Sequence, residues 1–409
     1  MAKKPARVRL QNSSRSRPGR VWPTVHVGLA AIVAVAALLA VLPPQSYRLF
    51  QARLVASEGS VWVLLAASLV LLTARPGRRG FVVAALAVLS IAAAAVPLVR
   101  AQPVASSLPG RMASAFGRLP EPDMAAIGRR APLVFRDLFG GVGLPDLVPR
   151  TIVYATVDGR ELLMDVFTPA QPRRAVSPGV LVVHGGGWRG GARTEFSGLS
   201  RHLAGLGYVI ASVDYRLAPA SPFPAARDDV TAAVAALRIH APELGLDAGR
   251  LALIGRSAGG QLVLLAAYTM NDPAVKGVVS FYGPTDLVYG YEHPADPDVF
   301  DSTAALAAYL GGHLRDRGVT YRMASPIAYV AQTTTPTLLI HGTSDELVEV
   351  EQSRRLDRRL REAGAPHLLV ELPWASHGCD YFLRGPCGQI STYAVEGFLA
   401  RVLRAGDRD

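Results

Sequence analysis

The sequence predicts an α/β protein in which a mostly parallel sheet, with helices on both faces, is preceded by about three transmembrane helices. Two patterns indicate this arrangement. After residue 150, short runs of Val, Leu and Ile alternate with longer segments of good helix formers. Before residue 100, apolar segments almost free of charge approach the roughly 20 residues that cross a bilayer. We expect a basic cytoplasmic tail at residues 1–20, a membrane region at 21–99, a linker at 100–150 and a large folded domain at 151–405.

The membrane helices are expected near residues 24–42, 55–74 and 81–99, which are rich in Ala, Val and Leu. The first and third segments have the required length, whereas the second reaches it only by starting near Val55 and holding Glu58 near the lipid headgroups. The first segment exceeds the roughly 7 to 15 apolar residues of a signal peptide, so an anchor is favoured over a cleaved signal. A buried helix hairpin is the remaining alternative.

Positive charge is concentrated beside these apolar segments. Residues 1–80 contain 12 Lys and Arg and one acidic residue, so they carry the whole net charge of +11. This distribution favours a multi-pass cell-membrane protein with a cytoplasmic tail over a nucleic-acid-binding module, whose basic residues would line one folded face. Three spans place the folded domain outside the cytoplasm, and two spans place it inside.

The elements of the folded domain follow one another along the chain. Residues 151–168 predict a hairpin that turns at Asp158 and Gly159 and forms the edge of the sheet. Apolar runs predict the strands, and segments of good helix formers predict the helices. We expect strands at 208–215, 250–255, 275–282, 337–340 and 368–372, a further strand from 179 into 184–188, and helices at 225–240, 261–268 and 350–363.

A Gly-x-Ser-x-Gly turn lies between an expected strand and an expected helix. A serine on such a tight corner projects its hydroxyl clear of the sheet, and Gly255 and Gly259 remove side chains that would collide there. The start of the helix directs backbone N–H groups towards developing negative charge. Ser257 is therefore the predicted nucleophile, and the alternative is that this serine only caps the helix.

The sequence HGGGW at residues 184–188 follows a strand of Val and Leu. Backbone N–H groups of glycine approach an oxyanion without steric hindrance, and the residue after a nucleophilic serine supplies another donor. Gly186, Gly187 and Ala258 are the expected oxyanion donors.

The same loop matches a second pattern, the G-x-G-x-x-G of dinucleotide-binding proteins. Gly190 completes it, and Asp214 ends the next strand, where a ribose-binding acid is expected. Trp188 and Arg189 place bulky side chains where a helix would have to begin beside the pyrophosphate, which disfavours this interpretation. We expect no cofactor.

The proton-transfer residues are expected on two later loops, each just past the end of a strand. Asp345 follows strand 337–340, and His377 follows strand 368–372. His377 would take the proton of Ser257 and return it to the leaving group, while Asp345 fixes the tautomer of the imidazole. The alternatives are Glu346 for the acid, and His341 or His367 for the base.

The order oxyanion loop, nucleophile, acid and base is that of the α/β-hydrolase fold. Residues 151–403 resemble the α/β-hydrolase carboxylesterases of the hormone-sensitive-lipase and feruloyl-esterase-like type. The resemblance lies in HGGGW, GRSAGG at 255–260, VDYRLAP at 213–219 and PFPAARDD at 222–229. It implies hydrolysis of small or lipid-like carboxylic esters through an acyl-serine intermediate, without a metal or cofactor.

The resemblance also implies supporting roles for several residues. His184, Tyr215 and Arg216 would hold the active-site loops, and Asp228 would begin a helix beside them. Arg256 departs from the family pattern, which has Asp or His before the serine, and this leaves the substrate class open. A serine peptidase or amidase on the same triad is an alternative function, as is a non-catalytic membrane-anchored binding protein of hydrolase fold.

Two further features accompany the triad. Cys379 and Cys387 lie close to His377, where they would form a disulfide outside the cytoplasm or remain two unlinked buried thiols. No CxxC or HExxH sequence is present, so we expect no zinc site. In the linker, the amphipathic residues 133–139 would lie on the bilayer, cover an acyl pocket or pack against the hydrolase.

Overall fold

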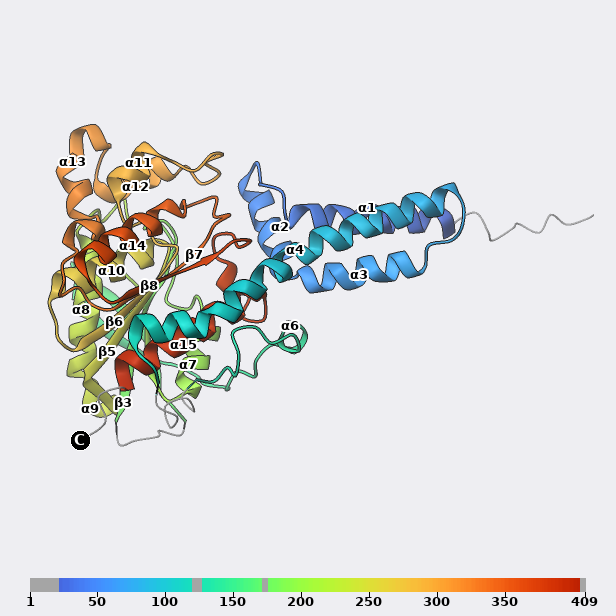
Figure 1. Cartoon of the computed structure of the whole chain (residues 1–409). Coiled ribbons are helices and arrows are strands. Elements are labelled where there is room, and N and C mark those ends of the chain that lie inside the picture. Colours follow the sequence, from blue (N-terminus) through green and yellow to red (C-terminus); the bar gives the residue numbers. More distant parts are fainter. Residues whose placement is uncertain (1–21, 120–126, 171–175, 405–409) are drawn as a thin grey trace, which may run out of the picture.

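The computed structural model describes residues 22–119, 127–170 and 176–404. A single eight-stranded sheet has the order β1-β2-β4-β3-β5-β6-β7-β8 (Figure 1). The pairs β1–β2 and β2–β4 are antiparallel, and all later pairs are parallel, as the sequence predicts. The strands are β1 Arg150–Val157, β2 Arg160–Phe167, β3 Ser177–Val183, β4 Val209–Val213, β5 Leu246–Arg256, β6 Val275–Phe281, β7 Thr337–Gly342 and β8 His367–Leu372.

The central strands β3 and β4 are buried along their whole length, and β6 is buried except at Lys276, because helices cover both faces of the sheet. In β3, Leu181 and Val183 face one apolar cluster while Val180 and Val182 face the other. The edge hairpin turns at Asp158 and Gly159, which both have positive φ, as a tight two-residue turn requires.

Helices α8, α10 and α14 supply side chains to the first apolar cluster, and α7 and α15 supply side chains to the second. The helices of this region are α7 Ser197–Gly205, α8 Ala225–Ile239, α9 Ala241–Leu244, α10 Ala258–Met270, α11 Leu287–Glu292, α12 Ser302–Leu310, α13 Leu314–Met323, α14 Glu351–Ala363 and α15 Pro386–Arg404, with 3₁₀ turns at Pro326–Tyr329 and Cys379–Tyr381.

The N-terminal helices project away from the sheet as a bundle of α1, α3 and α4, and α2 lies at its junction with the catalytic region (Figure 1). Within the described residues only α4 is by itself long and apolar enough to cross a membrane, and α2 with α3 passes the same test as a bent pair. The helices are α1 Trp22–Leu39, α2 Tyr47–Glu58, α3 Ser60–Leu72 and α4 Arg78–Phe116.

This arrangement corrects the expectation of about three continuous membrane helices. The segment predicted at 55–74 is broken at Gly59, and its two parts meet at 74°. The physical reason is the polar composition of α2, which contains Arg48, Gln51, Arg53 and Glu58 and packs against protein.

The segment from residue 100, which the sequence predicts to be a linker, begins as a helix in the structure. Helix α4 continues to Phe116, and Ala101, Ala105, Leu108 and Met112 are buried in the apolar cluster that α15 also lines. The spacing of these residues, at three to four positions, places them on one helical face. The prolines in this stretch favour a linker in the sequence, but the packed face keeps the chain helical.

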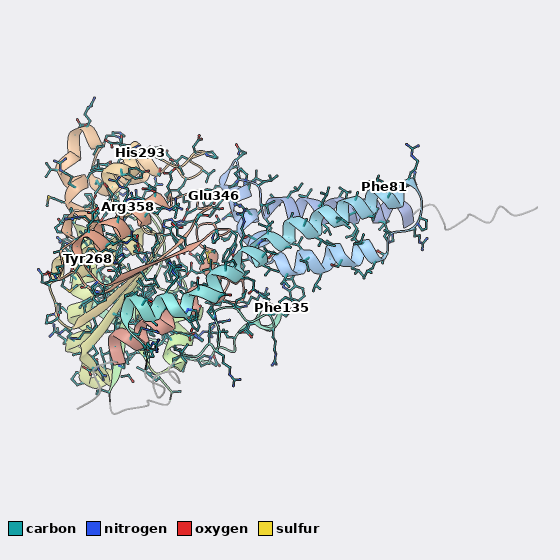
Figure 2. All side chains as sticks on the ribbon, viewed as in Figure 1. Phe81, Phe135, Tyr268, His293, Glu346 and Arg358 are labelled. Atoms are coloured by element: carbon teal, nitrogen blue, oxygen red, sulfur yellow. A yellow bond between two sulfur atoms is a disulfide. The ribbon has the colours of Figure 1, made fainter. Side chains whose placement is uncertain are left out.

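The amphipathic residues 133–139 lie between the bundle and the catalytic region. The ring of Phe139 meets Trp62 of α3 edge to face at 5.4 Å, and the backbone N–H of Val134 donates to Gln389 of α15. Phe135, at 66% exposed, lies well away from Glu346 of the catalytic loops (Figure 2). The segment therefore packs as a bridge between helices.

Candidate active site

Ser257 lies on a strained corner between β5 and α10. Its φ of 54° and ψ of −122° lie outside the regions that side chains normally occupy, which costs about 1–3 kcal/mol. The corner is held because the Ser257 N–H donates to the carbonyl of Phe281 at 2.9 Å and the Ser257 carbonyl accepts from Gln261 at 3.1 Å. A Cβ on Gly255 would strike the Gly259 backbone, and a Cβ on Gly259 would strike that of His184. These two glycines permit the corner, as the sequence predicts.

His377 and Asp345 meet at the carboxyl edge of the sheet. The Nδ1 atom of His377 lies 2.7 Å from Oδ2 of Asp345. The other carboxylate oxygen accepts backbone N–H groups from Leu347 and Val348, both at 2.9 Å. Burial alone would raise the pKa of Asp345, but the charge of His377 and hydrogen bonds from His341 and His377 hold this pKa well below its usual range. Asp345 is therefore an ionised, fixed partner for His377.

None of the three alternative residues takes the place of Asp345 or His377 in this pair, although His341 also contacts Asp345 at 3.4 Å. His341 is fully buried, with Nδ1 2.7 Å from the Ser353 hydroxyl and Nε2 2.9 Å from the Val348 carbonyl. Glu346 pairs with Arg53 and accepts a hydrogen bond from Ser376. His367 forms an ion pair with Asp357 on α14. His341 thus supports the loop of Asp345, and the other two make contacts away from His377.

A cavity of about 540 Å³ lies in front of Ser257 and His377. Gly186, Gly187 and Ala258 line the same cavity, so five of the six residues expected to act on substrate share it, and Asp345 lies behind His377. Gly186 and Gly187 have φ of 103° and 58°, and a Cβ on Gly187 would lie 2.6 Å from the ring of Phe300. Only glycine fits this loop.

Tyr215, one of the expected supporting residues, contacts the start of the glycine loop. The Tyr215 hydroxyl donates to the carbonyls of His184 and Gly185 at 3.2 and 3.1 Å, and the rings of His184 and Tyr215 stack at 4.3 Å. Burial lowers the pKa of His184, so its imidazole is neutral near pH 7. Arg216 pairs with Asp229 at 2.7 Å. Asp228, which the resemblance implied at this helix start, is in the first turn of α8 and pairs with Arg227, so Asp229 is the residue that sequence reasoning missed.

Arg256, the departure from the family pattern, has a buried partner. Its side chain forms an ion pair with Asp380, and its guanidinium lies 3.6 Å from the ring centroid of Phe196. The Tyr282 hydroxyl also donates to Asp380, and the Tyr282 ring lies 4.2 Å from the ring of His377. A buried arginine requires a carboxylate partner, but the sequence shows neither the burial of Arg256 nor its pairing with Asp380 across 124 positions.

A disulfide joins Cys379 to Cys387 in the loop that follows His377. The sequence left open whether these two cysteines are bonded or remain two unlinked thiols. The bond fixes the chain between the base and the start of α15 and limits the freedom of the histidine loop.

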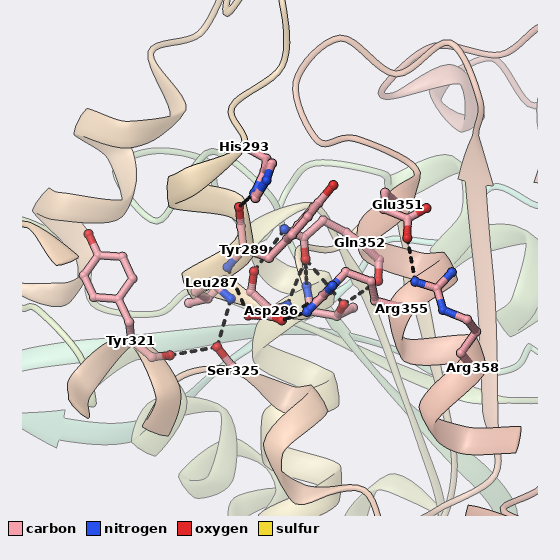
Figure 3. A network of polar contacts seen from close by, with 11 residues as sticks. Asp286, Leu287, Tyr289, His293, Tyr321, Ser325, Glu351, Gln352, Arg355 and Arg358 are labelled. Atoms are coloured by element: carbon pink, nitrogen blue, oxygen red, sulfur yellow. Dashed lines mark hydrogen bonds and ion pairs between the residues drawn. The ribbon is translucent and has the colours of Figure 1, made fainter. Parts of the chain in front are cut away.

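One wall of the active-site cavity, which includes Gln352, is stabilised by a polar network between α11 and α14 (Figure 3). The side-chain oxygen of Gln352, a cavity residue, accepts the backbone N–H groups of Thr285 and Asp286, both at 2.8 Å. Asp286 pairs with Arg355 at 2.7 Å. These bonds anchor α14 beside the loop of Asp345.

Helix α2 supplies the remaining wall, which the sequence did not predict. Its side chains that line the cavity are Tyr47, Phe50, Gln51, Leu54 and Val55. From the sequence, residues 47–54 are expected in a loop and residues from Val55 onwards in a membrane helix, because nothing local shows that α2 lies against the catalytic loops.

Comparison with known proteins finds a family match and similar esterases. The family described as BD-FAE matches residues 164–360. The chain is 34% identical over 272 residues to the esterase LipC of Mycobacterium tuberculosis, covering 63% of this chain and 66% of LipC. It is 32% identical over 239 residues to the esterase LipQ of the same organism, covering 54% of this chain and 55% of LipQ. The chain thus spans less than two thirds of the length of these curated relatives.

A solved structure described as a truncated form of a carbohydrate esterase from gut microbiota superposes with a TM-score of 0.51 at 20% identity. The match covers 63% of this chain and 100% of that chain. This likeness, with the strand order above, shows the α/β-hydrolase fold. In sequence, this chain is therefore similar to esterases, and the solved structure shows the fold alone.

Proposed function

We propose that this chain is a membrane-anchored serine carboxylesterase that works through an acyl-Ser257 intermediate. The single observation that carries the proposal is the shared cavity, where Ser257, His377 and the glycine loop meet while Asp345 binds His377 from behind. No residue in the proposed chemistry depends on a cofactor.

In the proposed first half-reaction, the Ser257 hydroxyl oxygen attacks the ester carbonyl carbon as His377 accepts the hydroxyl proton at Nε2. The carbonyl oxygen becomes an oxyanion and accepts hydrogen bonds from the backbone N–H groups of Gly186, Gly187 and Ala258. When the intermediate collapses, the bond to the alcohol oxygen breaks, and this oxygen takes the proton from His377. The acyl group remains on Ser257.

In the second half-reaction, His377 takes a proton from water, and the resulting hydroxide oxygen attacks the acyl carbon. Collapse of this intermediate breaks the bond to Ser257, whose oxygen recovers the proton from His377, and releases the carboxylic acid. Asp345, whose pKa is lowered, stays ionised in both halves and stabilises the imidazolium.

The test is a p-nitrophenyl ester series from acetate to palmitate on the full chain in detergent, with Ser257→Ala and, as the matched control, Ser106→Ala on the exposed side of α4. We expect Ser257→Ala to lose at least about 10⁴-fold in kcat and Ser106→Ala to match the wild type. Equal hydrolysis by all three proteins would reject the proposal. A p-nitroanilide series run alongside separates an esterase from the peptidase or amidase alternative.

The membrane anchoring is proposed on the exposed apolar side chains of the bundle. Ile32 on α1, Leu69 on α3 and Phe81 on α4 are each more than 60% exposed. Single exposed apolar residues are ordinary, but a bundle covered with them is suited to lipid. The disulfide supports a catalytic region outside the cytoplasm, where such bonds persist. A C-terminal alkaline phosphatase fusion should be active, and an inactive phosphatase beside a fluorescent C-terminal green-fluorescent-protein fusion would reverse this topology.

A further inference from the structure

Helix α2 connects the membrane bundle to the active-site cavity in one continuous stretch of chain. Its side chains line the cavity in front of Ser257, and after Gly59 the chain continues directly into α3 of the bundle. No other element of the bundle contributes to the cavity among the described residues. The wall beside the nucleophile therefore belongs to the apolar bundle and not to the hydrolase fold.

The inner face of α2 is held firmly on the catalytic loops. Arg53 forms a buried ion pair with Glu346, whose other oxygen accepts the hydroxyl of Ser376 next to His377. One turn later, the Glu58 carboxylate accepts the backbone N–H of Cys387 at 3.1 Å. A buried charged pair tolerates only a fixed position of this kind, so the Arg53–Glu346 pair makes α2 a docked helix and not a loose tether.

The outer part of the same helix forms the mouth of the cavity. Val55 lines the cavity and is 57% exposed, and Tyr47 also lines it and is 45% exposed. Deeper in, Phe50 is almost fully buried, and Leu54 approaches the backbone of Gly378, where a Cβ would lie 3.7 Å away. Apart from Gln51, the side chains of α2 that line the cavity are aromatic or aliphatic, from the mouth to the residue next to His377.

The size and chemistry of the cavity match an acyl chain. Its volume of about 540 Å³ lies within the roughly 300–1,000 Å³ of small-molecule sites. Besides those of α2, the apolar side chains of Phe300, Leu306, Leu347 and Phe382 line the cavity, and polar ones such as Glu349 and Gln352 line it too. The apolar part of this lining stabilises methylene groups by removing them from water.

The amphipathic residues 133–139, which the sequence offered as a cap, do not line this cavity. They contact α3 and α15 instead. Helix α2 occupies the place that such a cap would take.

We propose that the substrates are long-chain esters dissolved in the bilayer, which pass from lipid along α2 into the cavity. The proposal rests on the proposed esterase function and adds the substrate class and its route of entry. The acyl chain lies against Val55 and Leu54, and the ester carbonyl reaches Ser257 beyond them.

The first test uses two matched tryptophan substitutions on α2 in the full chain, reconstituted in phosphatidylcholine vesicles. Val55→Trp narrows the mouth, whereas Leu49→Trp changes a residue that is 41% exposed on the same helix and does not line the cavity. We expect Val55→Trp to lower kcat/KM for the dodecanoate ester by about 10-fold or more while leaving the acetate ester within about 2-fold. Leu49→Trp should match the wild type on both esters.

The second test addresses the route of entry. A long-chain ester is placed either in the vesicles that hold the enzyme or in separate vesicles of the same composition. Entry from lipid predicts hydrolysis about 10-fold faster when enzyme and ester share a bilayer, since the ester leaves a bilayer slowly. Equal rates in the two arrangements would overturn the proposed route.

The outcomes separate this inference from the esterase function itself. Labelling of Ser257 by a fluorophosphonate shows that the nucleophile is active in each variant. If labelling persists and Val55→Trp affects both esters equally or neither, α2 is not the acyl wall. If the wild type is neither labelled nor able to hydrolyse any ester, the proposed function fails instead.

Discussion

The catalytic region and the helical bundle use the same apolar residue types in opposite ways. In the catalytic region, strands such as β3 bury every residue between covering helices. In the bundle, Ile32 and Leu72 are 68% and 83% exposed. Exposing so much apolar surface is unfavourable in water, so the contrast supports the proposal that the bundle lies in lipid while the catalytic region lies in water.

Helix α4 extends from the exposed surroundings of the bundle to the buried surroundings of the catalytic region. Near its start, Phe81 is 76% exposed, whereas Leu108 and Met112 near its end are buried under the catalytic region. The helix therefore ties the bundle to the sheet without a flexible joint. Helix α2 makes the second connection, through Arg53 and Glu346.

The largest expected effect lies wholly in the catalytic region. Asp345→Asn should lower kcat by about 10⁴-fold while the protein stays folded, because the imidazole loses the charge that fixes its tautomer. The measurement is ester hydrolysis with circular dichroism as the check on folding. Asp316→Asn, on exposed α13, is the matched control and should have no effect. If Asp345→Asn kept its activity, Glu346 would have to be considered again as the acid of the triad.

The Asp345 carboxylate also has a defined pH dependence. Its folded-state pKa is lowered, so its contribution to stability is complete above the ordinary value of 3.8 and is lost as pH falls through the lowered pKa. Below pH 4, the free energy of unfolding of Asp345→Asn should therefore depend less on pH than that of the wild type. Between pH 5 and 8, the two proteins should show the same pH dependence.

The next largest effect tests the junction between the regions. Arg53→Met leaves Glu346 buried without its partner, which should destabilise the protein by about 3–5 kcal/mol. Since Glu346 also binds Ser376 beside His377, kcat for the acetate ester should fall too. Thermal unfolding and ester kinetics measure both effects. Arg48→Met, exposed on the same helix, is the control, and equal unfolding temperatures for the two variants would show that α2 docking contributes little.

A smaller effect tests directly whether the bundle lies in lipid and the catalytic region in water. Leu69 on α3 and Val319 on α13 are 62% and 63% exposed. Leu69→Glu should cost about 2.5–3.5 kcal/mol of membrane insertion and move protein out of the membrane fraction. Val319→Glu should change stability by less than about 0.5 kcal/mol and leave fractionation unchanged. The same behaviour in both variants would remove the proposed difference between the regions.

The smallest effect concerns a partly buried ion pair of the catalytic region. The hydrogen bond with Asp357 raises the pKa of His367, so this pair stabilises the fold fully below pH 6.5 and is lost as pH rises through the raised pKa. His367→Gln should therefore cost up to about 1 kcal/mol at pH 5.5 and less at pH 9. Denaturant titrations at the two pH values measure the difference, and a larger cost at pH 9 would contradict it.

Much of the catalytic region could be predicted because its signals are local. The turn around Ser257 and the loop at Gly186 and Gly187 are each written in a few consecutive residues, whose glycines meet steric demands made by adjacent backbone. The hairpin at Asp158 and the parallel order of the later strands follow from similarly local patterns. The bundle was predicted less well, since apolar composition identifies a helix without fixing where it bends.

By itself, the sequence determined the fold class, the order of the candidate catalytic loops and the presence of an apolar N-terminal region. Only the tertiary structure decided which of its charged residues meet. Arg53 is 293 positions from Glu346, and Arg256 is 124 positions from Asp380, so no local pattern links either pair. The need to neutralise charge away from water brings such residues together, and the folded chain alone provides their partners.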